Sequence, residues 1–258
     1  MLPASLAGIE DDRGRFREVF CEVLEAQGDN LRDYRPCGEA LTRLGEEPEG
    51  SGAPVHLGQA RRPLTLALVP GVGWGCFESW LQLTESGGRH IAQFGYAGEL
   101  VEVDSLSGEM IVAAQIRDYV LDWAQRDTGR ELVLLGYSKG APDILRALVD
   151  YPEIQRHVTA VVSLAGSIGG SPLAYDASQW QLDLLASWPE ARCEKGEGNS
   201  LLSLTPHRRR QWLADNPLPA DIPYFSLVAL PQPERMSSGL NTSWRKLSHI
   251  DPRNDSQV

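Results

Sequence analysis

The sequence lacks an excess of basic residues, a long apolar run and an N-terminal leader. Its 258 residues include 24 Lys and Arg against 35 Asp and Glu, which gives a formal net charge of -11. Nucleic acids and acidic membrane surfaces attract basic proteins, so this charge argues against both as partners. No segment approaches the roughly 20 apolar residues of a membrane span. Residues 1–9 also lack the basic start and apolar stretch of a signal peptide. We therefore expect a cytoplasmic protein without a membrane span.

Cysteine is scarce and scattered along the chain. The four cysteines are Cys21, Cys37, Cys76 and Cys193. They form no CxxC pair, and no histidine stands near them at the spacing of a metal site. We therefore expect buried free thiols. Nothing in the sequence indicates a metal or an organic cofactor.

The first 54 residues differ from the rest of the chain. Apolar residues at helical spacing predict a helix that uses this stripe for packing. The stripe consists of Phe16, Val19, Phe20, Val23 and Leu24. A second short helix is expected over 37–44, and the polar, Gly/Pro-rich residues 45–54 indicate a linker. We predict a helical extension at 1–54, which could pack on the body, cover an edge of its sheet or bind a partner, and a body at 55–258.

Continuous apolar runs alternate with helical patterns beyond residue 55. Strands are expected over 64–69, 100–103, 131–136, 158–165 and 224–230, and helices over 110–124 and 142–151. Apolar strands separated by helices are typical of a parallel sheet that is covered on both faces. The sequence therefore predicts an α/β fold, in which a mostly parallel sheet carries helices on both faces.

The pattern breaks between residues 166 and 223, a stretch too long for an ordinary connection. It contains Trp180, Trp188 and Trp212, which suit either an apolar lid over a site or the attachment of the insertion to the body. The basic run 208–210 within it is interpreted as a solvated helix face. We predict a cap insertion at about 166–223.

The segment Gly136-Tyr-Ser-Lys-Gly140 lies between a predicted strand and a predicted helix. A serine between two glycines at such a turn is the pattern of a nucleophile elbow. Glycine suits both flanking positions because side chains there would collide with the neighbouring strand and helix. We interpret Ser138 as a nucleophile, against the alternative of a plain Gly-rich turn.

A serine nucleophile needs donors for the oxyanion that forms in the reaction. The glycine-rich loop Pro70-Gly-Val-Gly-Trp-Gly75 follows the first predicted strand. It allows a backbone N–H to point into the site, and we assign this donor to Val72. The second donor is the backbone N–H of Lys139, directly after the nucleophile. Trp74, Tyr137 and Asp104 are candidates for substrate contact, as is Asp143, although both aspartates also suit solvated or capping roles.

These motifs resemble those of the α/β-hydrolase superfamily, and within it the lipase, esterase and thioesterase branch. The likeness rests on Val69-Pro-Gly-Val-Gly73 in place of the His-Gly oxyanion motif, on the elbow, and on Asn254-Asp-Ser-Gln-Val258, which is similar to an acid-bearing lipase segment. The segment Gly169-Gly-Ser-Pro-Leu-Ala174 is a weaker match. The resemblance covers residues 64–258. It implies an α/β-hydrolase fold and an acyl-enzyme on Ser138, with an ester or thioester, including a lipid-like one, as the substrate.

The resemblance also implies the order nucleophile, acid, histidine. Asp255 is the best match for the acid, with Asp251 and then Glu234 as alternatives, and the segment 251–255 is also a good turn sequence. No histidine follows Asp255, and His249 precedes it at the end of a predicted helix over 240–247. We therefore give His249 a structural role and expect the last strand, the catalytic histidine and the closing helix beyond residue 258.

The sequence thus predicts a serine hydrolase that is impaired in the chain as given. Two other functions remain open, which are a non-catalytic binding or regulatory protein on the same scaffold and an acyltransferase that uses the same serine. The oligomeric state cannot be derived from the sequence.

Overall fold

The computed structural model describes residues 8–31, 33–74, 83–126, 129–175, 200–232, 234, 236 and 238–254. The chain divides into two compact units, residues 1–59 and 60–258. This division falls a few residues after the predicted domain boundary at Pro54. Among the described residues, no helix has the length and apolar character that crossing a membrane requires.

The first unit contains helix α1 (Arg13–Gln27), a 3-10 turn η2 (Gly28–Asn30) and helix α2 (Cys37–Ala40). Its predicted apolar stripe is not used as expected, because Phe16, Val19 and Val23 keep 39%, 37% and 41% of their surface exposed. Within the described part of α1 only Gly14 is buried. The unit therefore depends on contacts other than an apolar core.

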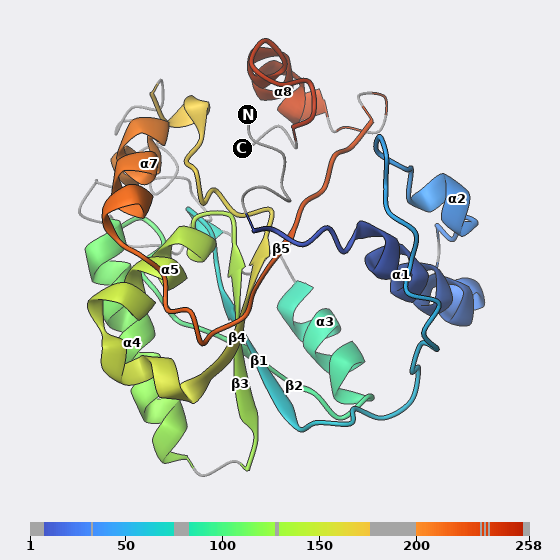
Figure 1. The fold of residues 1–258 in the computed structure, drawn as a ribbon, viewed down its shortest axis with the longest axis horizontal. Coiled ribbons are helices and arrows are strands. Elements are labelled where there is room, and N and C mark those ends of the chain that lie inside the picture. Colours follow the sequence, from blue (N-terminus) through green and yellow to red (C-terminus); the bar gives the residue numbers. More distant parts are fainter. Residues whose placement is uncertain are drawn as a thin grey trace, which may run out of the picture. The chain divides into compact units, whose positions relative to one another are not determined.

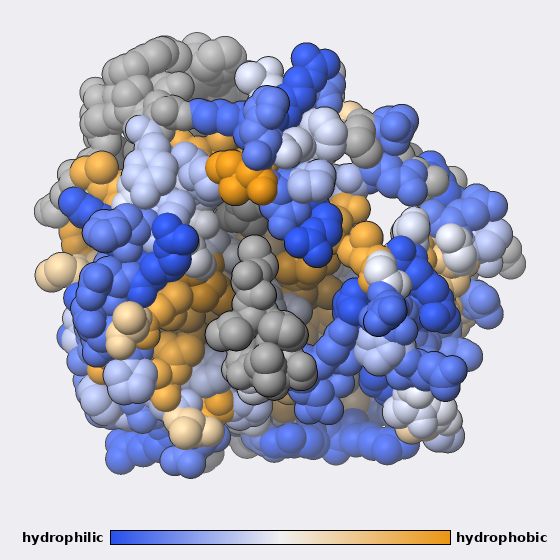
Figure 2. Space-filling view, turned by 45° about the horizontal axis from the view of Figure 1, so that its top comes forward, coloured by the Kyte–Doolittle hydropathy of each residue, from blue (hydrophilic) through white to orange (hydrophobic). Residues whose placement is uncertain are grey.

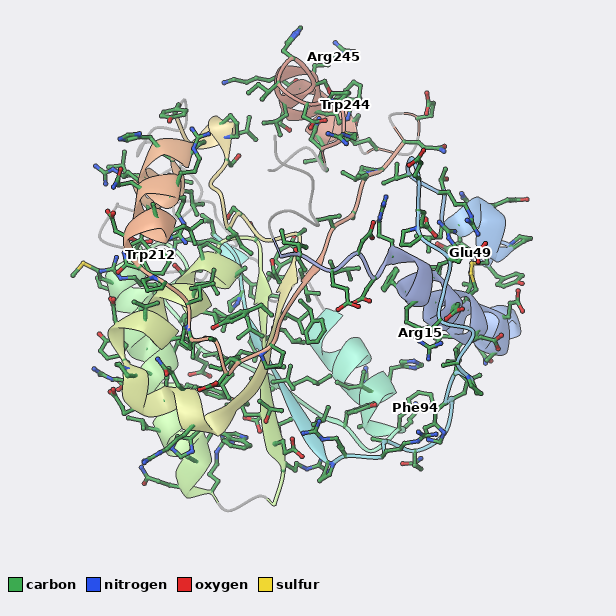
Figure 3. The ribbon with its side chains drawn as sticks, viewed as in Figure 1. Arg15, Glu49, Phe94, Trp212, Trp244 and Arg245 are labelled. Atoms are coloured by element: carbon green, nitrogen blue, oxygen red, sulfur yellow. A yellow bond between two sulfur atoms is a disulfide. The ribbon has the colours of Figure 1, made fainter. Side chains whose placement is uncertain are left out.

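Arginines on α1 supply these contacts to the segment that the sequence predicted as a linker. Arg17 forms an ion pair with Glu47 through two hydrogen bonds of 2.5 and 2.7 Å. Arg13 donates to the carbonyl oxygen of Leu44 at 2.6 Å, and Arg15 to that of Ala53 at 2.6 Å. Residues 44–53 are consequently tied along α1 (Figure 3, where Arg15 is labelled).

A disulfide between Cys21 on α1 and Cys37 at the start of α2 corrects the prediction of free thiols for these two residues. Their Cα atoms lie 5.3 Å apart, within the usual range for a disulfide. Sequence spacing did not reveal the pair because a 16-residue separation carries no motif. Cys76 and Cys193 lie outside the described residues. Disulfides are typical of oxidising compartments, which does not favour the expected cytoplasmic location.

The second unit is built on a five-stranded sheet in the order β2-β1-β3-β4-β5, with every pair of neighbours parallel. The strands are β1 (Leu64–Val69), β2 (Ala97–Leu100), β3 (Glu131–Tyr137), β4 (Val158–Leu164) and β5 (Tyr224–Leu227). Helices α4 (Glu109–Gln125) and α5 (Gly140–Asp150) cover one face, and α3 (Leu83–Ala92) lies on the other (Figure 1). The predicted mostly parallel sheet with helices on both faces is confirmed.

The remaining elements of this unit follow the elbow helix. They are the short 3-10 turns η4 (Pro152–His157), η5 (Pro172–Tyr175), η6 (Leu202–Leu204) and η8 (Ser238–Leu240), and the helices α7 (Pro206–Asp215) and α8 (Asn241–Ser248). Helix α8 agrees with the helix predicted over 240–247.

Helix α2 and strand β5 end earlier than the predicted 44 and 230. Two further elements differ from the prediction because glycine obscures them. Strand β2 begins at Ala97, earlier than the predicted 100–103, and a side chain at Gly98 would come within 3.0 Å of Ile91 on α3. Helix α3 was not predicted, since Gly87 and Gly88 break its helical pattern. Glycine thus allows the close packing of α3 on β2, and the same residue weakens the local signal for a strand.

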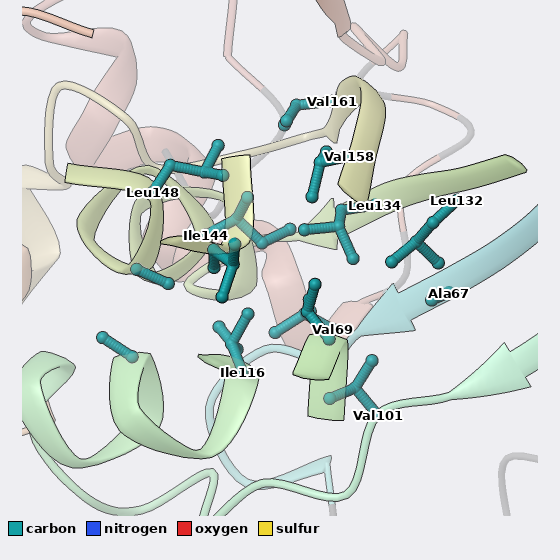
Figure 4. Close-up of a cluster of buried hydrophobic side chains, with 14 of the residues drawn as sticks. Ala67, Val69, Val101, Ile116, Leu132, Leu134, Ile144, Leu148, Val158 and Val161 are labelled. Carbon is teal, nitrogen blue, oxygen red and sulfur yellow. The ribbon is translucent and has the colours of Figure 1, made fainter. Parts of the chain in front are cut away.

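The apolar core lies between the sheet and helices α4 and α5 (Figure 4). Val69 and Leu134 from the sheet meet Ile116 from α4 and Ile144 from α5, and all four side chains are fully buried. Every position of β1 and β3 is buried or half-buried, which agrees with their continuous apolar sequence. Strand β5 is the exception, because Phe225 and Leu227 at the sheet edge are 52% and 38% exposed. On the face drawn in Figure 2, apolar side chains likewise come to the surface among hydrophilic ones.

Strand order directs attention to the carboxyl ends of β1 and β3. The chain leaves β1 toward β2 and then returns to place β3 on the other side of β1. In open parallel sheets, ligands bind beside such a reversal, at the carboxyl ends of the strands. Val69, Gly136 and Ser163 align across β1, β3 and β4, so the loops that follow these strands meet at one place.

The disulfide gives a prediction about the first unit. A bridge that closes a loop of about 15 residues contributes roughly 3 kcal/mol. We expect reduction, or the double substitution Cys21→Ser with Cys37→Ser, to increase the rate of limited proteolysis within residues 1–59 by more than tenfold. Cleavage within 60–258 serves as the internal control and should keep its rate. Equal cleavage of residues 1–59 with and without reductant would contradict the bridge.

Candidate active site

Ser138 sits at the sharp turn between β3 and α5 with a backbone φ of 51°. This left-handed conformation is unfavourable for a residue with a side chain. Three hydrogen bonds maintain it: Ser138 N–H donates to the Leu164 carbonyl at 3.1 Å, and the Ser138 carbonyl accepts from the N–H groups of Ala141 at 3.3 Å and Ser167 at 3.1 Å. The turn is therefore held by its own helix and by the strand and loop beside it.

The two glycines of the elbow are required by close backbone contacts, as predicted. A side chain at Gly136 would overlap the backbone of Ala141, and one at Gly140 would overlap the Val69 carbonyl oxygen and come within 2.9 Å of the Pro70 carbonyl oxygen. The helix can begin directly after Ser138 only because these two positions carry no Cβ.

The loop after β1 lies against the nucleophile. A Cβ at Gly71 would be 2.9 Å from the Ser138 Cβ and 3.4 Å from its Oγ. Trp74 N–H closes the loop by donating to the Gly71 carbonyl at 3.4 Å, and Gly73 takes a φ of 72°. Val72, the predicted oxyanion donor, thus lies within a tight turn beside Ser138.

Lys139, which carries the second predicted donor, stands at the N-terminal end of α5. Backbone N–H groups of a first helical turn have no partner within the helix and are available to an anion. A developing oxyanion at Ser138 would therefore lie near both predicted donors, although the assignment of Val72 and Lys139 stays a prediction.

The predicted substrate-contact residues fall into two groups. The rings of Trp74 and Tyr137 meet edge to face with centroids 5.9 Å apart, on the loop after β1 and at the end of β3. Asp104 instead closes its own loop, because its carboxylate accepts hydrogen bonds from Leu106 N–H at 3.1 Å and Ser107 Oγ at 2.5 Å. Asp104 thus stabilises its own loop, while α4 begins after Gly108 without a side-chain cap.

The side chain of Lys139 forms a buried ion pair that the sequence analysis did not foresee. Its Nζ lies 2.7 Å from Asp143 Oδ2, with the two side chains 1% and 2% exposed. Asp143 is therefore neither solvated nor free to contact substrate. Burial raises the pKa of Asp143 from 3.8 to about 6, against the opposing effect of the Lys139 ammonium.

A second buried cation corrects the interpretation of the arginine run. Arg208 and Arg210 are exposed as expected, but Arg209 on α7 is 1% exposed. Its Nη1 lies 2.9 Å from Glu109 Oε2 on α4. Its guanidinium carbon is 4.7 Å from the ring centre of Trp212, which is labelled in Figure 3. Trp212 thus packs on a buried cation, while Trp180 and Trp188 lie outside the described residues.

The predicted acid and base are not assembled at the elbow by the described residues. Asp255 lies outside them. Of the alternatives, Asp251 pairs with Arg253 at 2.9 Å, which holds the pKa of its carboxyl below the usual value, and Glu234 is exposed. His249 is exposed at the end of α8. None of the hydrogen bonds among the described residues joins a histidine to Ser138, so the position of the base beyond residue 258 stays a prediction.

Neither protein-family models nor curated proteins gave a match to the sequence, whereas solved structures did. The chain resembles the metagenomic carboxyl esterase MGS0156 with a TM-score of 0.90 and 37% sequence identity, over 100% of this chain and 77% of that one. It also resembles the mature form of the Bacillus licheniformis lipase BlEst2 with a TM-score of 0.60 and 20% identity, over 80% and 81% of the two chains. The second likeness is one of fold alone.

The close packing at the elbow predicts that alanine substitutions at two glycines change the free energy of unfolding very differently. Gly140→Ala should destabilise the protein by more than about 3 kcal/mol, since the new methyl group overlaps backbone that cannot move without breaking the sheet. Gly87→Ala is the matched control, because Gly87 is helical and nothing lies within 4 Å of its Cβ position. The control should stabilise the protein by up to about 1 kcal/mol. Urea unfolding measures the stability of the two variants. Equal unfolding midpoints would contradict the close backbone contact at Gly140.

The raised pKa of Asp143 predicts that the free energy of unfolding depends on pH. Its pKa in the folded protein is raised above the value in the unfolded chain, so its stabilising effect is present below pH 4 and is lost as pH rises through about 6. Asp143→Asn cannot titrate. We expect the free energy of unfolding of this variant, relative to the wild type, to increase by about 2 to 3 kcal/mol between pH 4 and pH 7. Urea titrations across that range measure the slope, and a constant difference would exclude it.

Proposed function

Because the chain belongs to the α/β-hydrolase superfamily of esterases and lipases, we propose that it cleaves carboxylic esters through an acyl-enzyme on Ser138. The observation that carries this proposal is the strained backbone of Ser138, which the bonds to Leu164 and Ser167 maintain beside Gly71. Strain of this kind presents a side chain for chemistry at a cost in stability.

The proposed reaction has two steps. The Ser138 Oγ attacks the ester carbonyl carbon as a general base takes its proton, and the carbonyl oxygen becomes an oxyanion facing the N–H groups of Val72 and Lys139. The bond to the alcohol oxygen then breaks, and the alcohol leaves with a proton. Water attacks the acyl-enzyme in the same way and releases the acid and Ser138. None of the residues that the structure describes is proposed as the general base.

Trp74 and Tyr137 supply the apolar surface that we propose for the substrate. Their edge-to-face packing at the ends of β1 and β3 is a rigid arrangement. A short acyl chain or an aromatic leaving group would suit this surface. A thioester satisfies the same chemistry, because its carbonyl carbon and oxyanion occupy the same positions.

Ser138→Ala tests the proposal. In a chain that includes the general base, which we expect beyond residue 258, it should reduce hydrolysis of 4-nitrophenyl acetate and butyrate by roughly 1,000-fold or more, since loss of the nucleophile removes the acyl-enzyme route. Residues 1–258 alone should be impaired before the substitution, because the members of a triad act as a unit. A fluorophosphonate probe should label the peptide that contains Ser138 in the wild type and fail to label the variant. Ser51→Ala, which removes an exposed hydroxyl in the first unit, should match the wild type in both assays.

The outcomes separate the proposal from its rivals. Activity and labelling that survive Ser138→Ala would assign the chemistry to another residue. A folded wild type that includes the segment expected to hold the base, yet shows neither hydrolysis nor labelling, would favour a binding or regulatory role on this scaffold. Labelling, together with release of 4-nitrophenol that rises when an alcohol acceptor is added and with recovery of the acyl group as an ester of that alcohol, would favour acyl transfer.

A further inference from the structure

Arg209 links segments that are distant in the sequence. Besides Glu109 on α4, it bonds the loop after β4, because its Nε donates to the Ile168 carbonyl oxygen at 3.2 Å. A second bond ties the same loop to the start of α7, from Ser171 N–H to the Leu204 carbonyl at 2.8 Å. The segment from Leu204 to Arg209 is therefore attached to this loop at two points.

The loop after β4 in turn holds the nucleophile. Ile168 follows Ser167, whose N–H donates to the Ser138 carbonyl. The loop has little freedom to adjust, since Ala165 takes a φ of 46° and a side chain at Gly166 would overlap Ser163 Oγ. A displacement at Ile168 would consequently be transmitted to the bond between Ser167 and Ser138.

The charge of Arg209 also belongs to a balanced group beneath the elbow. Glu109 accepts from Arg146 at 3.2 Å as well as from Arg209, and Arg146 pairs with Asp150 on α5. The negative charge of Glu109 raises the pKa of Asp143, and the positive charge of Arg209 lowers it. This ion cluster consists of the cations Lys139, Arg146 and Arg209 and the anions Glu109, Asp143 and Asp150.

We propose that Arg209 is a positioning residue for the nucleophile, which holds the loop after β4 against Ser138 through its bonds to Ile168 and Glu109. The assignment rests on the proposed function of Ser138. A guanidinium is suited to the task, because its planar fork can bond two acceptors in fixed directions. Stability alone does not call for a cation here, since apolar residues often replace buried ion pairs without loss.

The test compares two arginines of the same helix. Arg209→Lys keeps the charge but replaces the fork by one ammonium group, which cannot bond both acceptors in the same geometry. We expect kcat for 4-nitrophenyl butyrate to fall roughly 10- to 100-fold, with KM changed less than threefold and fluorophosphonate labelling of Ser138 slowed in proportion. Arg208→Lys, at an exposed neighbour, should keep kcat within twofold of the wild type.

A role in stability alone would give a different result. Arg209→Lys would then lower the melting temperature yet keep the wild-type kcat at a temperature where it is fully folded, and this outcome would overturn the proposal. Arg209→Met also removes the charge, and its kcat should be lower than that of Arg209→Lys. Arg208→Met is its control. If the Arg209→Met variant does not fold, the kcat of Arg209→Lys alone tests the proposal.

Hydrogen exchange provides a readout that does not depend on catalysis. In Arg209→Lys, peptides covering 138–141 and 165–168 should exchange at least tenfold faster than in Arg208→Lys, while peptides of β1 keep their rate. Unchanged exchange in both segments would overturn the linkage even if activity fell. Failure of the proposed function is seen separately, as hydrolysis and labelling that persist in Ser138→Ala.

Discussion

The left-handed backbone of Ser138 is the constraint on which the rest of the site depends. A residue with a Cβ adopts it at a cost of roughly 1 to 2 kcal/mol, so its surroundings must specify it. They do so through the Leu164 carbonyl on one side and the N–H groups of Ala141 and Ser167 on the other. The close approach of α5 to β1 then leaves no room for a side chain at Gly136 or Gly140. Strand register, helix start and loop geometry all follow from placing one hydroxyl at the end of β3.

The ion cluster adds a second layer of constraint. Lys139 and Asp143 are almost fully buried within the first turns of α5, and Arg209 brings α7 to Glu109 on α4. Three of the six charged side chains in the cluster, Lys139, Asp143 and Arg209, are buried. Burying a charge is expensive unless it is paired, so these pairings constrain the relative positions of the helices. An apolar core tolerates small shifts, whereas a guanidinium fork between two acceptors does not. The ion cluster therefore lies next to Ser138, where a small displacement of the backbone would have the largest effect on the proposed chemistry.

The parts of this fold that could be predicted are those with local signals. β1, β3 and β4 are continuous apolar runs because every position in them is buried or half-buried, and the elbow was recognisable because sterics demand glycine at 136 and 140. Glycine also caused the errors, at α3 and at the start of β2. The clamp from Ser167 to Ser138 and the pair of Glu109 with Arg209 join residues far apart in sequence. Their partners are set by tertiary packing, so no spacing rule could find them, and the same holds for the disulfide of Cys21 with Cys37.

In a serine hydrolase site, the nucleophile with its oxyanion donors and the residues that transfer the proton are therefore determined by different parts of the sequence. The proposed nucleophile and oxyanion donors depend on backbone geometry, which the sequences 69–75 and 136–140 specify through glycine and strand order. Proton transfer depends on an imidazole and a carboxylate, whose side chains must be brought together by later segments. A scaffold that only bound ligands would be more stable with glycine at 138, since glycine adopts a φ of 51° at no steric cost. A serine there, held by three backbone hydrogen bonds, agrees with the proposed chemistry at its Oγ.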